Sequence, residues 1–281
     1  MDRIISHALA IEQEAAQEAG ALGFMARAMI QATLPHKKVA GNTFERTNGN
    51  YTLTIIASPK IGLPYGAMPR LLLSWVTTEA IRTKSRDLVL GDSLSGFMRE
   101  LGLVPTGGRW GSITTLKNQS ERLFGSVFQA YYKNTDTKES AILNKTIADA
   151  AHFWWDAPSP DQIGMWNSNI KLSEQFFDEV TSHPVPIDMR AIKALKGSAM
   201  ALDIYCWLTY RSSYLKKQTE IPWGLLALQF GSAYNRTDNF KAAFVKELRK
   251  VLFIYPDARV DVTAKGLIVK PAPPHIKGRL V

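Results

Sequence analysis

Cysteine, long apolar runs and an uncharged N-terminal segment are absent or nearly absent from this sequence. The single cysteine, Cys206, excludes an intrachain disulfide, and its place in the apolar run Ala201–Leu208 predicts a buried thiol. No stretch approaches the roughly 18 apolar residues of a membrane-spanning helix, and Glu12, Glu14 and Glu18 interrupt any signal-peptide core. We therefore expect a cytoplasmic protein with no membrane role.

The sequence also lacks the motifs of enzymes that act on DNA. No Gly-x-x-x-x-Gly-Lys-Ser/Thr loop occurs, which argues against nucleotide hydrolysis. A nicking enzyme would need a metal-binding histidine pair near a nucleophilic tyrosine. The five histidines are instead scattered singly, at His7, His36, His152, His183 and His275. The pair Tyr131-Tyr132 is better explained as packing at a helix end, and we expect no catalysis, no metal and no cofactor.

The sequence does contain a concentrated region of positive charge. Residues 183–281 hold 16 Lys and Arg against 7 Asp and Glu, a net charge of +9, whereas residues 1–182 hold 18 of each and are neutral. A basic region indicates an anionic partner such as nucleic acid. The chain of 281 residues is long enough for two domains of ordinary size.

The basic region contains a stretch, Asn239–Leu252, that predicts an amphipathic helix. At about 100° per residue, one side carries apolar residues that can pack, namely Phe240, Phe244, Leu248, Val251 and Leu252. The opposite side is polar and cationic, with Asn239, Lys246, Arg249 and Lys250. A solvated helix surface would explain Lys246 and Arg249, but it would not explain why all the excess charge lies in this region.

The elements around the basic helix follow the order of a winged helix-turn-helix domain. They are a strand Thr219–Pro222, a helix Trp223–Phe230, a turn Gly231–Thr237, the basic helix, and a hairpin of Arg259–Thr263 and Gly266–Val269. Lys246, Arg249 and Lys250 are then candidates for phosphates or guanine edges, and Asn239 for adenine. Asn235, Arg236 and Thr237 would contact the DNA backbone. Lys265, at the hairpin tip, is either a wing contact or a solvated turn lysine.

The first part of the chain predicts a similar order. Asn48-Gly49 between Thr43–Arg46 and Tyr51–Ala57 is a strong hairpin signal. The elements expected after it are a helix Arg70–Lys84, a strand Leu88–Leu90, a helix capped by Ser93 that ends at Leu101, a helix Ser112–Tyr132, and strands Ser140–Lys145 and Ala148–Trp155. Thr115, Asn118 and Arg122 face outward from the third helix, and Arg109 and Lys117 are phosphate candidates. This face is weaker because Glu121 is nearby, so Asn118 and Arg122 could equally be ordinary surface residues.

The expected fold is therefore α+β, with two tandem winged helix-turn-helix domains that are rich in helices and have short strands and β-hairpin wings. We expect an N-terminal helical segment at 1–40, since residues 3–30 have helical composition. A first winged-helix domain with a preceding β-ribbon is expected at 41–164, and a second, basic one at 165–281. The second domain would begin with a strand Met165–Leu172 and a helix near Ser173, followed by a helix pair at 189–215 that is split near Gly197.

Trp154 and Trp155 are adjacent on an expected apolar strand. Successive strand residues point to opposite faces, so both cannot enter one core. One of them is expected at an interface, either between domains or between two copies of the chain.

Several runs of the sequence resemble plasmid-encoded replication initiators of the RepA type. The resemblance is carried by 62–66 (GLPYG), 70–75 (RLLLSW), 82–86 (RTKSR), 90–94 (LGDSL) and 107–111 (GGRWG), and it extends through 152–155 (HFWW) and 187–190 (IDMR) to about residue 272. Residues 1–40 match nothing in this family.

The resemblance implies a protein that binds direct repeats in double-stranded plasmid origin DNA and helps to open the adjacent duplex. It also implies recruitment of host replication proteins, the host initiator and the replicative helicase machinery, and the existence of monomers and homodimers. Individual base-contacting positions do not carry over, so the candidate site residues rest on helix geometry. The main alternative is a winged-helix transcriptional repressor, and a nickase is a distant third.

Overall fold

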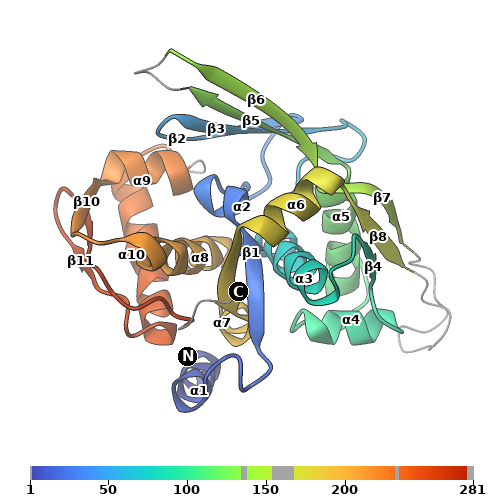
Figure 1. Cartoon of the computed structure of the whole chain (residues 1–281), viewed down its shortest axis with the longest axis horizontal. Coiled ribbons are helices and arrows are strands. Elements are labelled where there is room, and N and C mark those ends of the chain that lie inside the picture. Colours follow the sequence, from blue (N-terminus) through green and yellow to red (C-terminus); the bar gives the residue numbers. More distant parts are fainter. Residues whose placement is uncertain (1, 134–137, 154–167, 232–233, 277–281) are drawn as a thin grey trace.

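A computed structural model describes residues 2–133, 138–153, 168–231 and 234–276 of this α+β protein (Figure 1). Its helices are α1 (Asp2–Gln13), α2 (Arg27–Gln31), α3 (Ala67–Thr83), α4 (Leu94–Glu100), α5 (Ser112–Phe124), α6 (Glu174–Ser182), α7 (Met189–Leu195), α8 (Ala199–Tyr214), α9 (Trp223–Phe230) and α10 (Thr237–Ile254). Its strands are β1 (Leu22–Ala26), β2 (Thr43–Asn48), β3 (Tyr51–Ala57), β4 (Asp87–Val89), β5 (Ser126–Lys133), β6 (Ser140–Thr146), β7 (Ala148–His152), β8 (Asn169–Leu172), β9 (Pro184–Asp188), β10 (Thr219–Pro222), β11 (Val260–Val262) and β12 (Gly266–Val269).

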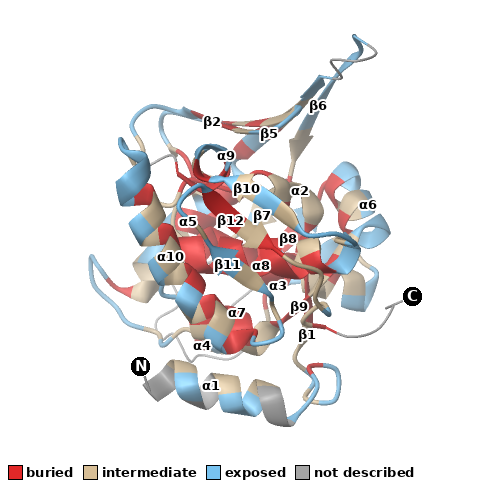
Figure 2. Ribbon diagram, turned by 90° about the vertical axis from the view of Figure 1, so that its left-hand side faces the viewer, coloured by how far each residue is buried: buried red, intermediate tan, exposed pale blue. Residues whose placement is uncertain are grey.

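The described strands form several small antiparallel sheets, with orders β2-β3-β5-β6, β4-β8-β7, β1-β9 and β10-β12-β11. The predicted hairpin is confirmed, but its turn lies one residue later than Asn48-Gly49. Asn48 ends β2 and pairs with Tyr51, so the loop is formed by Gly49, whose φ of 59° favours glycine, and Asn50. The β5–β6 hairpin of the same sheet projects away from the body (Figures 1 and 2). Among the described residues, no helix combines the length and hydropathy needed to cross a membrane.

The two longest helices of the core, α3 and α8, pack on each other at the centre of the molecule. Both are buried around most of their circumference, as Figure 2 shows for α8, so neither has a broad solvent face. The predicted cap at Ser93 is confirmed, since its side chain accepts from the Gly96 N–H at the start of α4. Serine side chains also cap α6 and α8, where Ser173 accepts from the Phe176 N–H and Ser198 from the Ala201 N–H.

The expectation of helix through residues 3–30 is wrong between α1 and α2. Residues Leu22–Ala26 form β1, which pairs with β9 in register from Leu22–Asp188 to Ala26–Pro184. Four of the five β1 residues are buried, and β1 also packs against α3. The alanine-rich composition favours helix, but a strand satisfies the backbone of this buried segment through a partner about 160 residues away.

The third helix was also expected to extend too far, to Tyr132. It ends at Phe124, and Ser126–Lys133 form β5 between β3 and β6. The spacing of the apolar residues in this stretch fits both a helix and a strand. Burial alternates at its start as in a strand, since Ser126 and Phe128 are buried while Val127 is exposed. Gly125 lies at the junction, where a Cβ would collide with the Glu121 carbonyl oxygen.

In the second part, helices α7 and α8, strand β10, helix α9 and the β11–β12 hairpin lie where the sequence predicts them. Strand β8 is described from Asn169, and the earlier part of the strand expected at 165–172 lies outside the described residues. The interface hypothesis for Trp154 and Trp155 also falls outside them. Strands β1 and β4 pair with β9 and β8, so backbone pairing crosses the expected boundary at 164, and the domain division remains a prediction.

Candidate nucleic-acid interface

Helix α10 buries the apolar side predicted from its sequence. Phe240, Phe244 and Leu248 are at most 1% exposed, and the two phenylalanine rings pack in a cluster with Trp223 and Phe230 of α9. The helix also packs against α8. Because one side is held by this cluster, the opposite side is directed to solvent.

The solvent side of α10 carries the expected polar and cationic residues. Asn239, Lys246 and Arg249 are exposed. Lys250 is half-buried, and its ammonium group lies 2.8 Å from the Glu247 carboxylate one turn back. Lys246 and Arg249 are therefore the cations of this surface that are best placed to meet a ligand.

The turn before α10 and the terminal hairpin extend this surface. Asn235, Arg236 and Thr237 are all exposed, and Arg236 lies 3.5 Å from Asp238, which is itself exposed. Lys265 is exposed at the tip of the β11–β12 hairpin. The hydroxyl of Thr263 closes that tip by accepting from the Gly266 N–H at 2.9 Å.

Lys241 has a structural role that the sequence did not reveal. Its ammonium group lies 5.2 Å from the centre of the Trp223 ring and donates to the Thr263 carbonyl oxygen at 3.2 Å. The Trp223 indole N–H donates to the same carbonyl at 3.1 Å. These contacts join α9, α10 and the hairpin into one unit. Lys241 lies on the border between the two faces of the helix, so the sequence pattern did not indicate this role.

Helix α5 presents a different surface from α10. Thr115 and Asn118 are exposed, and Lys117 is partly exposed. Arg122 turns back to the protein, because its guanidinium donates to the Leu63 carbonyl oxygen at 3.1 Å and lies over the Tyr65 ring. The sequence placed Arg122 on the outer side of the helix, but it could not reveal that this long side chain folds back onto the loop before α3.

The loop that leads into α5 holds two exposed side chains. Arg109 is exposed, and its guanidinium lies 5.1 Å from the centre of the Trp110 ring. Trp110 is 86% exposed. Sequence reasoning nominated Arg109 and missed Trp110, although its position between Arg109 and Gly111 places it next to a helix that was already a candidate.

Helices α5 and α10 lie on the same side of the molecule. Figure 1 shows them to the right and left of the central helices, whereas Figure 2, turned by 90°, shows both on the left. The backbones of the two helices that carry the nominated residues are therefore on one side of the molecule.

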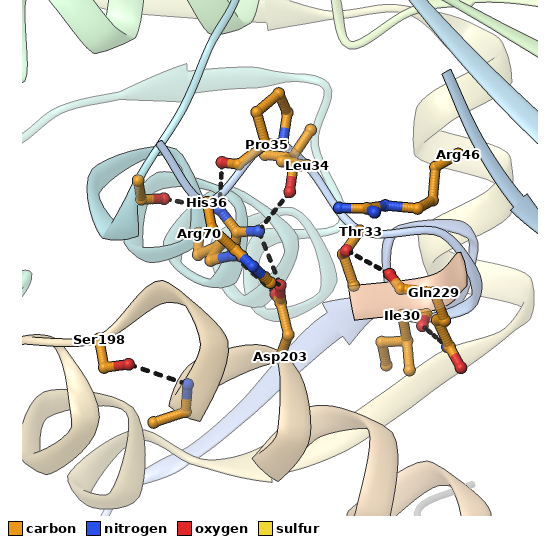
Figure 3. Close-up of polar contacts among 12 residues, drawn as sticks. Ile30, Thr33, Leu34, Pro35, His36, Arg46, Arg70, Ser198, Asp203 and Gln229 are labelled. Carbon is orange, nitrogen blue, oxygen red and sulfur yellow. Dashed lines mark hydrogen bonds and ion pairs between the residues drawn. The ribbon is translucent and has the colours of Figure 1, made fainter. Parts of the chain in front are cut away.

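A buried ion pair joins helix α3 to helix α8 (Figure 3). The Arg70 guanidinium of α3 donates to both carboxylate oxygens of Asp203 in α8, at 2.6 and 2.7 Å, and His36 Nε2 lies 2.7 Å from the same carboxylate. Arg70 also donates to the carbonyl oxygens of Leu34 and Gly66. The guanidinium and the carboxylate are thus almost completely satisfied within the protein.

The pKa directions agree with this arrangement. Burial by itself would raise the pKa of Asp203, but the charge of Arg70 and the hydrogen bonds from Arg70 and His36 outweigh it, and the pKa lies below its ordinary value. Burial lowers the pKa of His36, although its hydrogen bond to Asp203 acts in the opposite direction. The pair is therefore an ionised Arg70 and Asp203 with a neutral His36.

The segment after β1 makes further polar contacts between the halves. The Thr33 hydroxyl donates to the Gln229 carbonyl oxygen at 2.9 Å, and the Gln229 amide donates to the Ile30 carbonyl oxygen at 3.2 Å. The Arg46 guanidinium of β2 reaches the Leu228 carbonyl oxygen of α9. The segment after β1 and strand β2 are therefore held to α9 by polar contacts as well as by the apolar core.

Comparisons with known proteins give a family and a fold. A family model described as plasmid-encoded RepA protein matches residues 63–223. A crystal structure of domains 2 and 3 of RctB, in selenomethionine form, aligns with a TM-score of 0.56 at 10% identity, covering 86% of this chain and 95% of that chain. A second structure of RctB domains 2 and 3 aligns with a TM-score of 0.52 at 11% identity, covering 86% and 96%. No curated protein matches the chain.

Proposed function

Because this chain belongs to the family of plasmid-encoded RepA proteins, we propose that it initiates plasmid replication by binding repeated sites in double-stranded origin DNA. It would recognise these repeats sequence-specifically, promote opening of the adjacent duplex, and recruit the host initiator and replicative helicase machinery. Its role would be non-catalytic. The observation that carries the proposal is the exposed cationic side of α10 in a region whose excess positive charge is +9.

The second half supports its interpretation as a winged-helix domain. Helix α8, strand β10, helices α9 and α10 and the β11–β12 hairpin follow one another in the order of that fold, and β12 lies between β10 and β11. In this interpretation α10 is the recognition helix, the hairpin is the wing, and Lys265 contacts the backbone or the minor groove.

The first half supports the same interpretation less closely. Helix α3, strand β4, helices α4 and α5 and the β5–β6 hairpin follow the expected order. Strand β4, however, pairs with β8, whereas the β5–β6 hairpin joins the β2–β3 ribbon. We interpret this half as a winged helix whose wing has been added to a larger sheet.

In the proposed complex the two recognition helices would enter successive major grooves of one site. Lys246, Arg249 and Arg236 would bind phosphates or guanine edges, and Asn239 would read adenine. Arg109, Lys117, Thr115 and Asn118 would act in the same way at α5. Lys250 and Arg122 would contribute less, because Lys250 pairs with Glu247 and Arg122 is turned to Leu63.

Opening of the duplex would be driven by DNA binding and bending. Bending costs a few kcal/mol, and the contacts that the bend permits offset this cost. This scale suits opening of A·T-rich DNA next to the site. The chain could bind as a monomer, with both helices on one site, while a homodimer would occupy two.

Footprinting on the plasmid that encodes this chain, combined with permanganate probing, tests the proposal. An initiator should protect direct repeats and, with host factors, make nearby thymines reactive to permanganate. Protection of one symmetric site by a stable dimer, with the duplex closed, would identify a repressor instead. Relaxation of supercoiled origin DNA in the presence of a metal ion would identify a nicking enzyme.

A further inference from the structure

Trp110 is the most exposed large apolar side chain among the described residues, with 86% of its surface in contact with solvent. An aromatic side chain of this size contributes stability when it is buried, so this position does nothing for the fold. The next most exposed aromatic side chains in the described part of the chain, Phe253 and Tyr214, are 51% and 50% exposed, and other tryptophans such as Trp223 are buried. The exposure of Trp110 is therefore a property of its loop and calls for a ligand.

The loop that carries Trp110 is held in one conformation by hydrogen bonds. The Thr106 N–H donates to the Ser112 hydroxyl at 2.9 Å, and the Ser112 N–H donates to the Thr106 hydroxyl at the same distance. The Thr114 hydroxyl donates to the Gly108 carbonyl oxygen at 2.8 Å. At Gly111 any Cβ would collide with the carbonyl oxygens of Thr106 and Gly107. The indole is consequently presented at a fixed place, immediately before α5.

The surroundings of Trp110 favour an anionic ligand with flat faces. The Arg109 guanidinium lies over the indole at 5.1 Å from the ring centre, and Thr115 and Asn118 are exposed on the helix that follows. The exposed carboxylate of α5, Glu121, lies in its last turn, away from the loop. An indole beside a guanidinium matches the stacking platforms that proteins use for unpaired nucleotides, in which the base stacks and the cation binds the phosphate.

We propose that Trp110 stacks on a nucleobase that becomes unpaired when DNA next to the binding site opens, while Arg109 binds a neighbouring phosphate. The proposal rests on the proposed function and names a site for its opening step. The faces of paired bases are covered by their neighbours in the duplex, so the indole can gain this contact in opened DNA but not in closed DNA. A contact made in one state shifts the equilibrium towards that state.

The experiment compares two DNA probes with the full-length protein. One probe is a random-sequence duplex, and the other is the same duplex with a central bubble of mismatched thymines. Both dissociation constants are measured by fluorescence anisotropy at low salt. The variants are Trp110→Ala, Trp110→Phe as the aromatic control, and Arg249→Ala with Lys250→Ala as a control on the other half. Thermal unfolding checks that each variant is folded.

Wild type should prefer the bubble, and Trp110→Ala should weaken binding to the bubble by about 5- to 150-fold, the range of base–aromatic stacking. Binding of Trp110→Ala to the intact duplex should change by less than about threefold, and Trp110→Phe should keep most of the preference. The α10 double variant should weaken binding to both probes.

Three results would overturn the inference. Equal losses on both probes in Trp110→Ala would make Trp110 an ordinary duplex contact. If Trp110→Ala keeps its affinity for both probes while the α10 variant loses affinity, Trp110 would instead contact a protein partner. The proposed function stands in this case and in the previous one. Failure of wild type to bind either probe would refute the proposed function itself, and the inference with it.

Discussion

At the scale of single residues, the cations of α10 differ in how free they are. Arg249 is exposed, whereas the Lys250 ammonium is held by Glu247. A cation that already has a carboxylate partner must give it up before it can bind a phosphate, so sequence spacing overestimates the part of Lys250. Ion pairs between neighbouring turns of one helix contribute little to stability, and the loss of either partner should not unfold the helix.

Replacing Arg249 and Lys250 together by Ala should weaken DNA binding at least about tenfold and lower the salt slope by up to about two. Most of the effect should come from Arg249, because Lys250→Ala alone removes a paired cation. Titrations over a range of salt concentrations measure both quantities. The matched control removes two exposed lysines away from this face, Lys84 and Lys171. An unchanged slope in the double variant would remove this side of α10 from the interface.

His275 makes the stability of the protein depend on pH. Burial lowers its pKa to about 4, and its Nδ1 lies 2.7 Å from the Tyr205 hydroxyl. That hydroxyl accepts from the Asp188 N–H, and its own hydrogen can be donated to a neutral imidazole. The unfolded chain has the ordinary histidine pKa of about 6.5 and therefore takes up a proton first. The stabilisation is complete above about pH 6.5 and is lost as the pH falls towards 4.

The matching experiment is urea unfolding of wild type and His275→Gln at pH 7 and near pH 4.5. Between these values wild type should lose up to about 3 kcal/mol more than the variant. The low pKa of His36 acts in the same direction, but it is present in both proteins and cancels in the comparison. Equal losses in the two proteins would show that the proton taken up on unfolding does not go to His275.

At the scale of elements, helix ends are set by local chemistry, and the cap of α8 is an example (Figure 3). The Ser198 hydroxyl accepts from the Ala201 N–H, and this satisfies one of the backbone donors that a helix start leaves free. Helix α8 carries Asp203 and packs on α10, so its first turn supports both the buried ion pair and the helix with the exposed cations.

Ser198→Ala should cost about 1 kcal/mol of stability and lower the melting temperature by about 2–4 °C. Ser198→Asp should keep most of it, because aspartate is an equally good cap. Ser213 of the same helix donates to the Tyr210 carbonyl oxygen and caps nothing, which makes Ser213→Ala the control, with an expected change within about 0.5 kcal/mol. Similar losses in both alanine variants would show that the effect does not come from the cap at Ser198.

At the scale of the whole molecule, the contact between α3 and α8 decides how the two halves are placed. The Arg70–Asp203 pair is buried, so the two charged groups have few partners available other than those they already contact. Such a pair adds little net stability compared with apolar residues, but the loss of one partner leaves a buried charge without compensation.

Asp203→Ala should therefore destabilise the protein by about 3–5 kcal/mol, whereas Arg70→Met with Asp203→Leu should recover a large part of this loss. Urea unfolding of wild type, Arg70→Met, Asp203→Leu and the double variant gives the coupling energy. Additive losses would mean that the two side chains act independently. If the double variant is folded, its DNA affinity then reports whether the pair also positions α5 relative to α10.

Sequence patterns predicted many of the elements correctly because the information they need is local. The hairpin around Asn48-Gly49, the cap at Ser93 and the two-sided pattern of α10 each depend on residues within a few positions of one another. The location of the excess charge is likewise a property of the sequence. The family resemblance was carried by short runs between residues 62 and 190, within and around the segment that the family model matches.

What the sequence by itself determined, then, is where helices and turns begin, which side of α10 is cationic, and which family the chain resembles. Tertiary structure decided that Leu22–Ala26 and Ser126–Lys133 are strands, that Arg122 turns inward, and that Arg70 meets Asp203 across 133 positions. The physical reason is that strand pairing and burial belong to two segments at once. Neither segment carries the identity of its partner, so these features exist only in the folded chain.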